Sequence, residues 1–207
     1  MPNDPVEPST SGVPDGGDPI ETIVKAVGKP RRRRQSFLEW VIILVVAAGA
    51  SWFLRSYAFQ TFWIPSGSME PTLMIGDHVL VNKLSVTLGT INRGDVVVFR
   101  APEAAHIQCN DNIPIYVKRV IGLPGDHLTS KGNTIYVNGK PLNENWPHTE
   151  PLNRPIGNVT VPAHSYFMIG DNHANSCDSR YWGSLPASDI IGKVFLRIWP
   201  LTRFGPV

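Results

Sequence analysis

Residues 115–126 read IYVKRVIGLPGD and carry the clearest strand signal in the chain. The first seven residues are mostly β-branched or aromatic, and the Leu-Pro-Gly-Asp at the end is typical of a turn that closes a strand. Because side chains alternate between the two faces of a strand, Lys118 and Val120 share one face while Val117 and Arg119 share the other. This pattern predicts a strand that carries Lys118 inward. A lysine at a strand edge, facing solvent, is the alternative.

The same signal recurs on both sides of this strand. The other segments are short, rich in β-branched residues and separated by turns, and they are residues 59–64, 78–82, 95–100, 134–137, 165–169 and 191–199. Asn138-Gly139, directly after one of them, is a strong hairpin turn. Residues 140–157 hold four prolines and are expected to form a loop. No helix period of useful length appears in this part beyond a turn near Ser68, so we expect a mostly β domain.

Residues 37–54 read FLEWVIILVVAAGASWFL, with Glu39 as the single charge. A helix that spans a bilayer needs about 20 mostly apolar residues, and the aromatic residues that follow extend this run. The run is hydrophobic all round, which argues against a helix buried in a soluble core. A cleaved signal peptide is the other alternative, since residues 48–50 resemble a cleavage site, but the leader before the run is long. We expect an uncleaved transmembrane anchor.

The charges of this 207-residue chain are unevenly distributed. The net charge is +2, and the basic character is concentrated in Arg31 to Arg34, so no nucleic-acid-binding face is expected. The first thirty residues are rich in Pro, Gly, Ser and Asp and are expected to be disordered. Basic residues stay on the cytoplasmic side of a membrane span. The expected organisation is therefore a cytoplasmic tail (1–36), a membrane anchor (37–56) and an external domain (57–207), with the lipid bilayer as a partner.

Ser68 lies in the run IPSGSMEPTL at residues 64–73, where small and turn-forming neighbours leave a hydroxyl exposed. A serine needs a base to attack an amide, and Lys118 is the candidate. A free lysine has a pKa near ~10.4, so burial would have to lower it to roughly 7–8. The hydroxyl of Ser66 and the backbone N–H of Ser68 are candidate oxyanion donors. Met69 is expected either to pack in the core or to line a substrate groove.

Four sequence blocks resemble those of the bacterial type I signal peptidases and appear in the order found in that family. They are PSGSMEPTL (65–73), RGDVVVF (93–99), VKRVIGLPGD (117–126) and GDNHANSCDSR (170–180). The resemblance implies a coiled, mainly antiparallel β catalytic domain with a β-ribbon extension. It also implies a membrane-bound serine endopeptidase with a Ser–Lys dyad, which cleaves signal peptides from exported preproteins after small residues of the Ala-x-Ala type. No cofactor is implied.

The resemblance assigns roles to individual residues. Ser68 would be the nucleophile and Lys118 its base. Ser66 would help to bind the oxyanion, and Ser176 would hydrogen-bond the lysine amine and orient it. Asp171, Asp178 and Arg180 are expected to be structural, forming ion pairs with each other or with Arg119 near the site. The family usually has arginine at the position of His173. This departure weakens the prediction of the local ion pairs and leaves the predicted dyad unchanged.

The residue types present are also compatible with several other chemistries. Six histidines allow a Ser–His–Asp triad, for which His173 is the nearest candidate, but no separate motif supports it. No histidine spacing is typical of a metal site, so we expect no metal. A soluble Ser–Lys autoprotease of the SOS-repressor type would lack an anchor, and a non-catalytic, membrane-tethered β module that binds exported proteins would not need the dyad.

Cys109 and Cys177 either form a disulfide or remain two free thiols.

Overall fold

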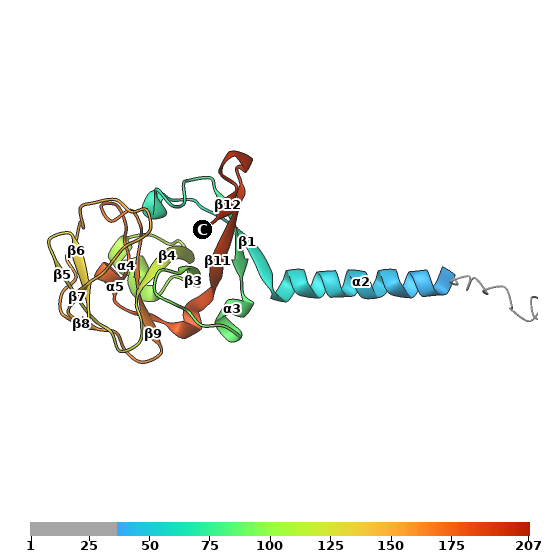
Figure 1. The fold of residues 1–207 in the computed structure, drawn as a ribbon, viewed down its shortest axis with the longest axis horizontal. Coiled ribbons are helices and arrows are strands. Elements are labelled where there is room, and N and C mark those ends of the chain that lie inside the picture. Colours follow the sequence, from blue (N-terminus) through green and yellow to red (C-terminus); the bar gives the residue numbers. More distant parts are fainter. Residues whose placement is uncertain (1–36) are drawn as a thin grey trace, which may run out of the picture. The chain divides into compact units, whose positions relative to one another are not determined.

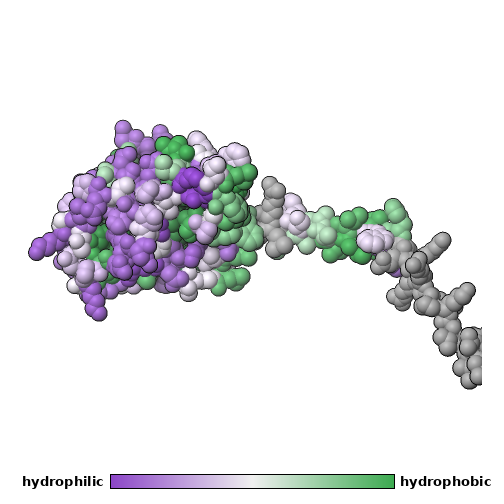
Figure 2. All heavy atoms as spheres, turned by 45° about the horizontal axis from the view of Figure 1, so that its top comes forward, coloured by the Kyte–Doolittle hydropathy of each residue, from purple (hydrophilic) through white to green (hydrophobic). Residues whose placement is uncertain are grey.

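The computed structural model describes residues 37–207, with only the backbone for residues 54–57. The predicted tail and the Arg31–Arg34 cluster lie outside the described residues. Helix α2 (Phe37–Tyr57) lies where the sequence predicts a helix, and its described side chains are exposed. Apolar side chains run along it in Figure 2. In the described part of the chain, no helix is long and apolar enough to cross a membrane.

The larger of two sheets carries most of the predicted strands (Figure 1). Its order is β1-β2-β11-β3-β4-β9-β10, with β12 paired to β11, and every pairing is antiparallel. The strands are β1 (Phe59–Trp63), β2 (His78–Asn82), β3 (Val96–Arg100), β4 (Ile115–Gly122), β9 (Ser165–Ile169), β10 (Leu185–Pro186), β11 (Ile190–Trp199) and β12 (Gly205–Pro206). The mainly antiparallel β fold is therefore confirmed.

A second, four-stranded antiparallel sheet has the order β7-β6-β5-β8. Its strands are β5 (His127–Lys131), β6 (Thr134–Val137), β7 (Lys140–Pro141) and β8 (Val159–Thr160). Asn138 and Gly139 join β6 to β7 with φ of 52° and 76°, as the hairpin signal predicts. The turn at 123–126 also forms, because the Asp126 N–H donates to the Leu123 carbonyl and Gly125 has φ of 85°.

The structure contains several short helices, of which the sequence predicted only the turn near Ser68. They are α3 (Leu84–Thr87), α4 (Glu103–Cys109), α5 (Ser179–Trp182) and the 3₁₀ turns η1 (Gly67–Met69), η2 (Ala187–Asp189) and η3 (Leu201–Arg203). The longest of these, α4, has only two turns, too few to show a helical period. It begins after Pro102 and ends at Asn110, whose φ of 51° is left-handed. Tertiary packing, not local sequence, therefore fixes these segments.

Strand β4 contributes to the core on both of its faces. Tyr116 and Val120 pack with Phe99 and Met168 in one buried cluster. Val117 packs against the margin of a second cluster, which lies on the opposite face of the strand. Alternation then places the side chain of Lys118 on the same face as Tyr116 and Val120, as the sequence predicts. The lysine is consequently surrounded by apolar groups.

Candidate active site

The turn η1 presents Ser68. Met69, the next residue, is 1% exposed and packs with Leu73, Val79 and Val81 in the second core cluster. The Leu73 N–H donates to the Met69 carbonyl at 2.9 Å. Met69 is thus anchored in the core, and it also lines an adjoining groove. The anchored methionine fixes the turn so that the serine side chain faces the groove.

The side chain of Lys118 contacts the hydroxyl of Ser68. The Lys118 Nζ donates a hydrogen bond to Ser68 Oγ, and the lysine is only 4% exposed. Burial lowers the pKa of Lys118 from its ordinary 10.5 to about 8, with the Asp178 carboxylate opposing this change and the Arg180 guanidinium adding to it. The carboxylates of Asp171 and Asp111 also oppose the change, so the pKa falls against three carboxylates, and desolvation is the dominant cause. A substantial neutral fraction of the amine exists near pH 8, as a general base requires.

Ser66 precedes the turn and is exposed. Its Oγ lies 3.5 Å from Ser68 Oγ, so both hydroxyls reach the same space. Asn172, which we did not single out from the sequence, supports the turn from the other side. Its backbone N–H donates to the Ser68 carbonyl at 3.1 Å and its Nδ2 donates to the Gly67 carbonyl at 3.0 Å. The only sequence signal for Asn172 was its place in the 170–180 block.

Ser176 lies near the dyad without bonding to it. The residue is 3% exposed, and its Oγ has no hydrogen-bond partner among the described residues. A Cβ added to Gly170 would collide with both Ser176 Oγ and the Ser68 carbonyl oxygen, so these two atoms lie against the same glycine. The predicted bond from Ser176 to the Lys118 amine is absent from this arrangement, although the hydroxyl is close to the nucleophile turn.

Two buried ion pairs hold the strand and loop around the site. Arg119 binds Asp171 in a bidentate manner, with Nε–Oδ1 at 2.8 Å and Nη2–Oδ2 at 2.6 Å. Arg180 binds Asp178 in the same way, at 2.8 and 2.7 Å. The Gly170 N–H also donates to Asp178 at 3.1 Å. These are pairings of the kind predicted, and they fix both ends of the 170–180 block.

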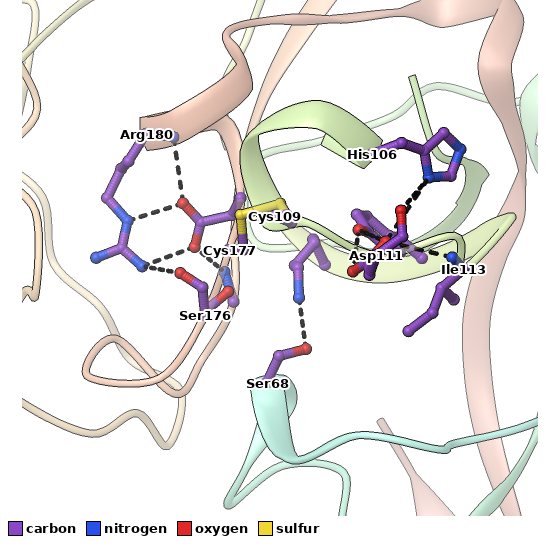
Figure 3. The surroundings of a disulfide bond; sticks show 12 residues. Ser68, His106, Cys109, Asp111, Ile113, Ser176, Cys177 and Arg180 are labelled. Atoms are coloured by element: carbon purple, nitrogen blue, oxygen red, sulfur yellow. Dashed lines mark hydrogen bonds and ion pairs between the residues drawn. A yellow bond between two sulfur atoms is a disulfide. The ribbon is translucent and has the colours of Figure 1, made fainter. Parts of the chain in front are cut away.

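A disulfide joins Cys109 at the end of α4 to Cys177, which decides between the two alternatives for these cysteines (Figure 3). The Cα atoms are 5.9 Å apart, within the usual range. In Figure 3 Cys177 lies on the same segment as Ser176 and Arg180. The bond therefore ties α4 to the loop that flanks Lys118.

An apolar groove of about 330 Å³ opens at the dyad. One wall is the end of β1 with the chain up to Met69, the other is the stretch from Asp111 to Lys118, and Cys177 adds to the lining. On this second wall β4 has a free edge, because β3 pairs with it from Ile115 while β9 pairs with it only from Arg119. Asp111 contributes a polar group and accepts from the Tyr116 hydroxyl at 2.6 Å. The groove thus has the edge and the apolar walls that an extended peptide needs.

His173 does not meet Ser68. In the part of the chain that the structure describes, the side-chain hydrogen bonds of Ser68 go to Ser66 and Lys118, and no histidine takes part. His173 is buried and packs against His148, with ring centroids 5.0 Å apart. Burial lowers the pKa of His173 to about 4. The arrangement does not support a triad built on this histidine.

Fold and site together define a serine peptidase. The family model described as "Signal peptidase, peptidase S26" matches residues 37–199, and the chain belongs to this family. The probable signal peptidase I-2 of Synechocystis is 37% identical over 187 residues, which cover 89% of this chain and 84% of that protein. The signal peptidase I of Leptolyngbya laminosa is 35% identical over 201 residues, covering 97% and 90%.

A crystal structure of a signal peptidase I from Enterococcus faecalis is 28% identical to this chain. The match covers 50% of this chain and 96% of that one, with a TM-score of 0.40.

Proposed function

We propose that this chain is a membrane-bound signal peptidase I, an endopeptidase that removes signal peptides from exported preproteins after small residues of the Ala-x-Ala type. The observation that carries the proposal is the hydrogen bond between the buried Lys118 amine and the Ser68 hydroxyl at the end of an apolar groove. Family membership supports the same conclusion. The dyad makes Ser68 the nucleophile and Lys118 the base.

The reaction follows from this geometry. The neutral Lys118 amine takes the Ser68 proton as Oγ attacks the scissile carbonyl, and the resulting ammonium returns a proton to the leaving amine. The Ser66 hydroxyl and the Ser68 N–H would donate to the oxyanion that forms between these steps. Water, activated by the same lysine, then hydrolyses the acyl-serine ester. No further proton carrier is needed.

The substrate would bind as an extended strand. The free edge of β4 at residues 115–118 offers main-chain groups to a peptide, and the groove walls would receive alternate side chains. A groove of about 330 Å³ that must hold several residues of a peptide favours small side chains before the cut. This supports an Ala-x-Ala preference.

The activity is tested with full-length enzyme in detergent and a synthetic peptide that spans an Ala-x-Ala site. We expect one cut after the second alanine, identified by mass spectrometry of the products. A matched peptide with leucine in place of each alanine should be cleaved far more slowly. An enzyme that folds but cuts neither peptide would refute the proposal.

Sequence supports a membrane anchor at residues 37–56, which would separate a cytoplasmic tail (1–36) from an external catalytic domain (57–207). The apolar run follows four arginines, and most of the described side chains of α2 are exposed apolar groups. We expect protease added to intact spheroplasts to digest the catalytic domain and to spare an N-terminal tag. Lysed spheroplasts are the control, and a catalytic domain protected in intact ones would reverse the topology.

The pH dependence of cleavage should follow the protonation of Lys118. Because Lys118 must be neutral to act as a base, activity is lost as the pH falls through its pKa of about 8. Below that value kcat/KM should fall about tenfold per pH unit. The measurement is kcat/KM from pH 6 to 10 on the peptide above. An acidic limb at the pKa of an ordinary histidine, about 6.5, would instead indicate a histidine base.

Ser176 is expected to orient the Lys118 amine during turnover. Its buried hydroxyl lacks a partner, and a neutral hydroxyl can place the amine without holding it charged. Ser176→Ala should lower kcat by some part of the ~10²–10⁴-fold that a general base contributes, with little change in KM. Ser176→Thr should recover part of the activity if the added methyl fits. Parent-like kinetics for Ser176→Ala would leave Ser176 as only a turn residue.

A further inference from the structure

Three possible metal ligands meet where the loop after β7 packs on the 170–180 block. Glu144 and His148 come from the loop and His173 from the block, and one ligand atom from each lies within 4.8 Å of the others. Glu144 Oε2 is 3.3 Å from His148 Nε2 and 3.8 Å from His173 Nε2. Tetrahedral zinc with bonds of about 2.0–2.2 Å separates its ligand atoms by about 3.3–3.6 Å. The two distances to Glu144 match or approach this range, and the two histidine atoms, which are no more than 4.8 Å apart, would move to within it when they share one ion.

The surrounding hydrogen bonds favour ligand geometry. His148 Nδ1 lies 3.0 Å from the Trp146 carbonyl oxygen, which can only accept, so Nδ1 carries the proton. In the neutral ring the lone pair of His148 is then on Nε2, the atom that faces Glu144. A ligating histidine commonly donates its other N–H to a backbone carbonyl in this way. His173 Nδ1 has no partner among the described residues, so the polar contacts of that ring also run through Nε2.

The cluster is largely buried and lies beside a guanidinium that is already paired. The side chains of Glu144 and His173 are only 10% and 2% exposed. Arg119, the nearby guanidinium, is already bound in a bidentate manner to Asp171. A buried carboxylate is normally paired with a cation or bound to a metal.

We infer that Glu144, His148 and His173 bind one Zn²⁺ ion, with water in the fourth position. Two imidazoles and a carboxylate form a donor set that zinc accepts, and it suits zinc better than Mg²⁺ or Ca²⁺, which prefer oxygen ligands. No sequence pattern indicated this site, because Glu144 and His148 lie in a proline-rich loop far from His173 in the chain. The ion goes beyond the proposed peptidase chemistry and takes no part in it.

The ion would link the loop after β7 to the 170–180 block, which contacts the turn at Ser68. The Thr149 N–H already donates to the Asp171 carbonyl at 2.8 Å, and the Asn153 N–H donates to the His173 carbonyl at 3.3 Å. Asn172, next to His173, donates hydrogen bonds to the carbonyls of Gly67 and Ser68. Zinc at His173 would therefore stabilise the segment on which the turn at Ser68 rests.

The test uses the full-length protein in detergent, stripped with a chelator and titrated with ZnCl₂ against a chromophoric chelator. We expect one zinc per chain and a rise in unfolding temperature of roughly 5–10 °C when free zinc is about 100-fold above Kd. Co²⁺ added to the stripped protein should give the strong visible absorption of a four-coordinate site. The Ser68→Ala variant should bind zinc as the parent does. Zinc binding is therefore tested independently of the proposed peptidase activity.

Two variants locate the site. Glu144→Gln keeps the shape of the side chain, and His148→Ala changes the most exposed of the three ligands, so both should fold. Each should lose more than the roughly 10–100-fold in zinc affinity that loss of an outer-shell partner costs. His78→Ala, which removes an exposed histidine from β2, is the matched control and should bind like the parent. The inference is overturned if the parent binds no zinc, or if both variants bind it as the parent does.

Discussion

Ser68→Ala is expected to lower kcat by about 10⁶-fold, and Lys118→Met by at least about 10⁴-fold, with the fold preserved in both variants. Ser68→Ala removes the atom that attacks the carbonyl. Lys118→Met removes the amine that hydrogen-bonds that atom, and it leaves little cavity because methionine is similar in length. The measurement is single-turnover cleavage of the Ala-x-Ala peptide, with circular dichroism to verify folding.

The double variant provides a second check on the dyad. Because residues that act as one unit are strongly non-additive, Ser68→Ala with Lys118→Met should be no slower than the slower single variant. His78→Ala controls for the general effect of removing a basic side chain. Near-normal turnover by Lys118→Met would mean that another group deprotonates the serine, and the dyad would be wrong.

Asp178→Ala should destabilise the domain by about 3–5 kcal/mol, because it leaves the guanidinium of Arg180 buried without its partner. The carboxylate accepts from Arg180 Nε and Nη2 and from the Gly170 N–H, and both charged side chains are fully buried. For a protein of this size the loss corresponds to a fall of roughly 6–20 °C in Tm. Thermal unfolding followed by circular dichroism measures it.

The same variant should alter the pH profile. The Asp178 carboxylate raises the pKa of Lys118 and the Arg180 guanidinium lowers it, so removal of the carboxylate should move the acidic limb of activity to lower pH. Glu103→Ala, which removes an exposed carboxylate at the start of α4, should change stability by no more than about 0.5 kcal/mol. If Asp178→Ala were as stable as this control, the buried pair would contribute nothing to the fold.

Local sequence predicted much of the sheet. The strands at 78–82, 134–137 and 165–169 were predicted with their observed bounds, because β-branched and aromatic residues between turn residues favour extended backbone. The turn at Asn138-Gly139 followed from the left-handed φ that these residues tolerate. Strand β5, with the sequence HLTSK, gave no such signal, since it has only two apolar or β-branched residues. Its neighbours β6 and β8 hold it in the sheet.

The sequence by itself determined the residue types of the site, namely Ser68 in its small-residue turn, Lys118 on a strand and the charged block at 170–180. Only the tertiary structure decided the state of these groups. The pKa of Lys118 falls because Tyr116 and Val120 lie on its face of β4 and the core covers them. Likewise, packing joined Cys109 to Cys177 and brought His173 to the loop that carries Glu144. Backbone preference is local and can be read from neighbours, whereas desolvation and side-chain grouping depend on residues that are distant in the chain.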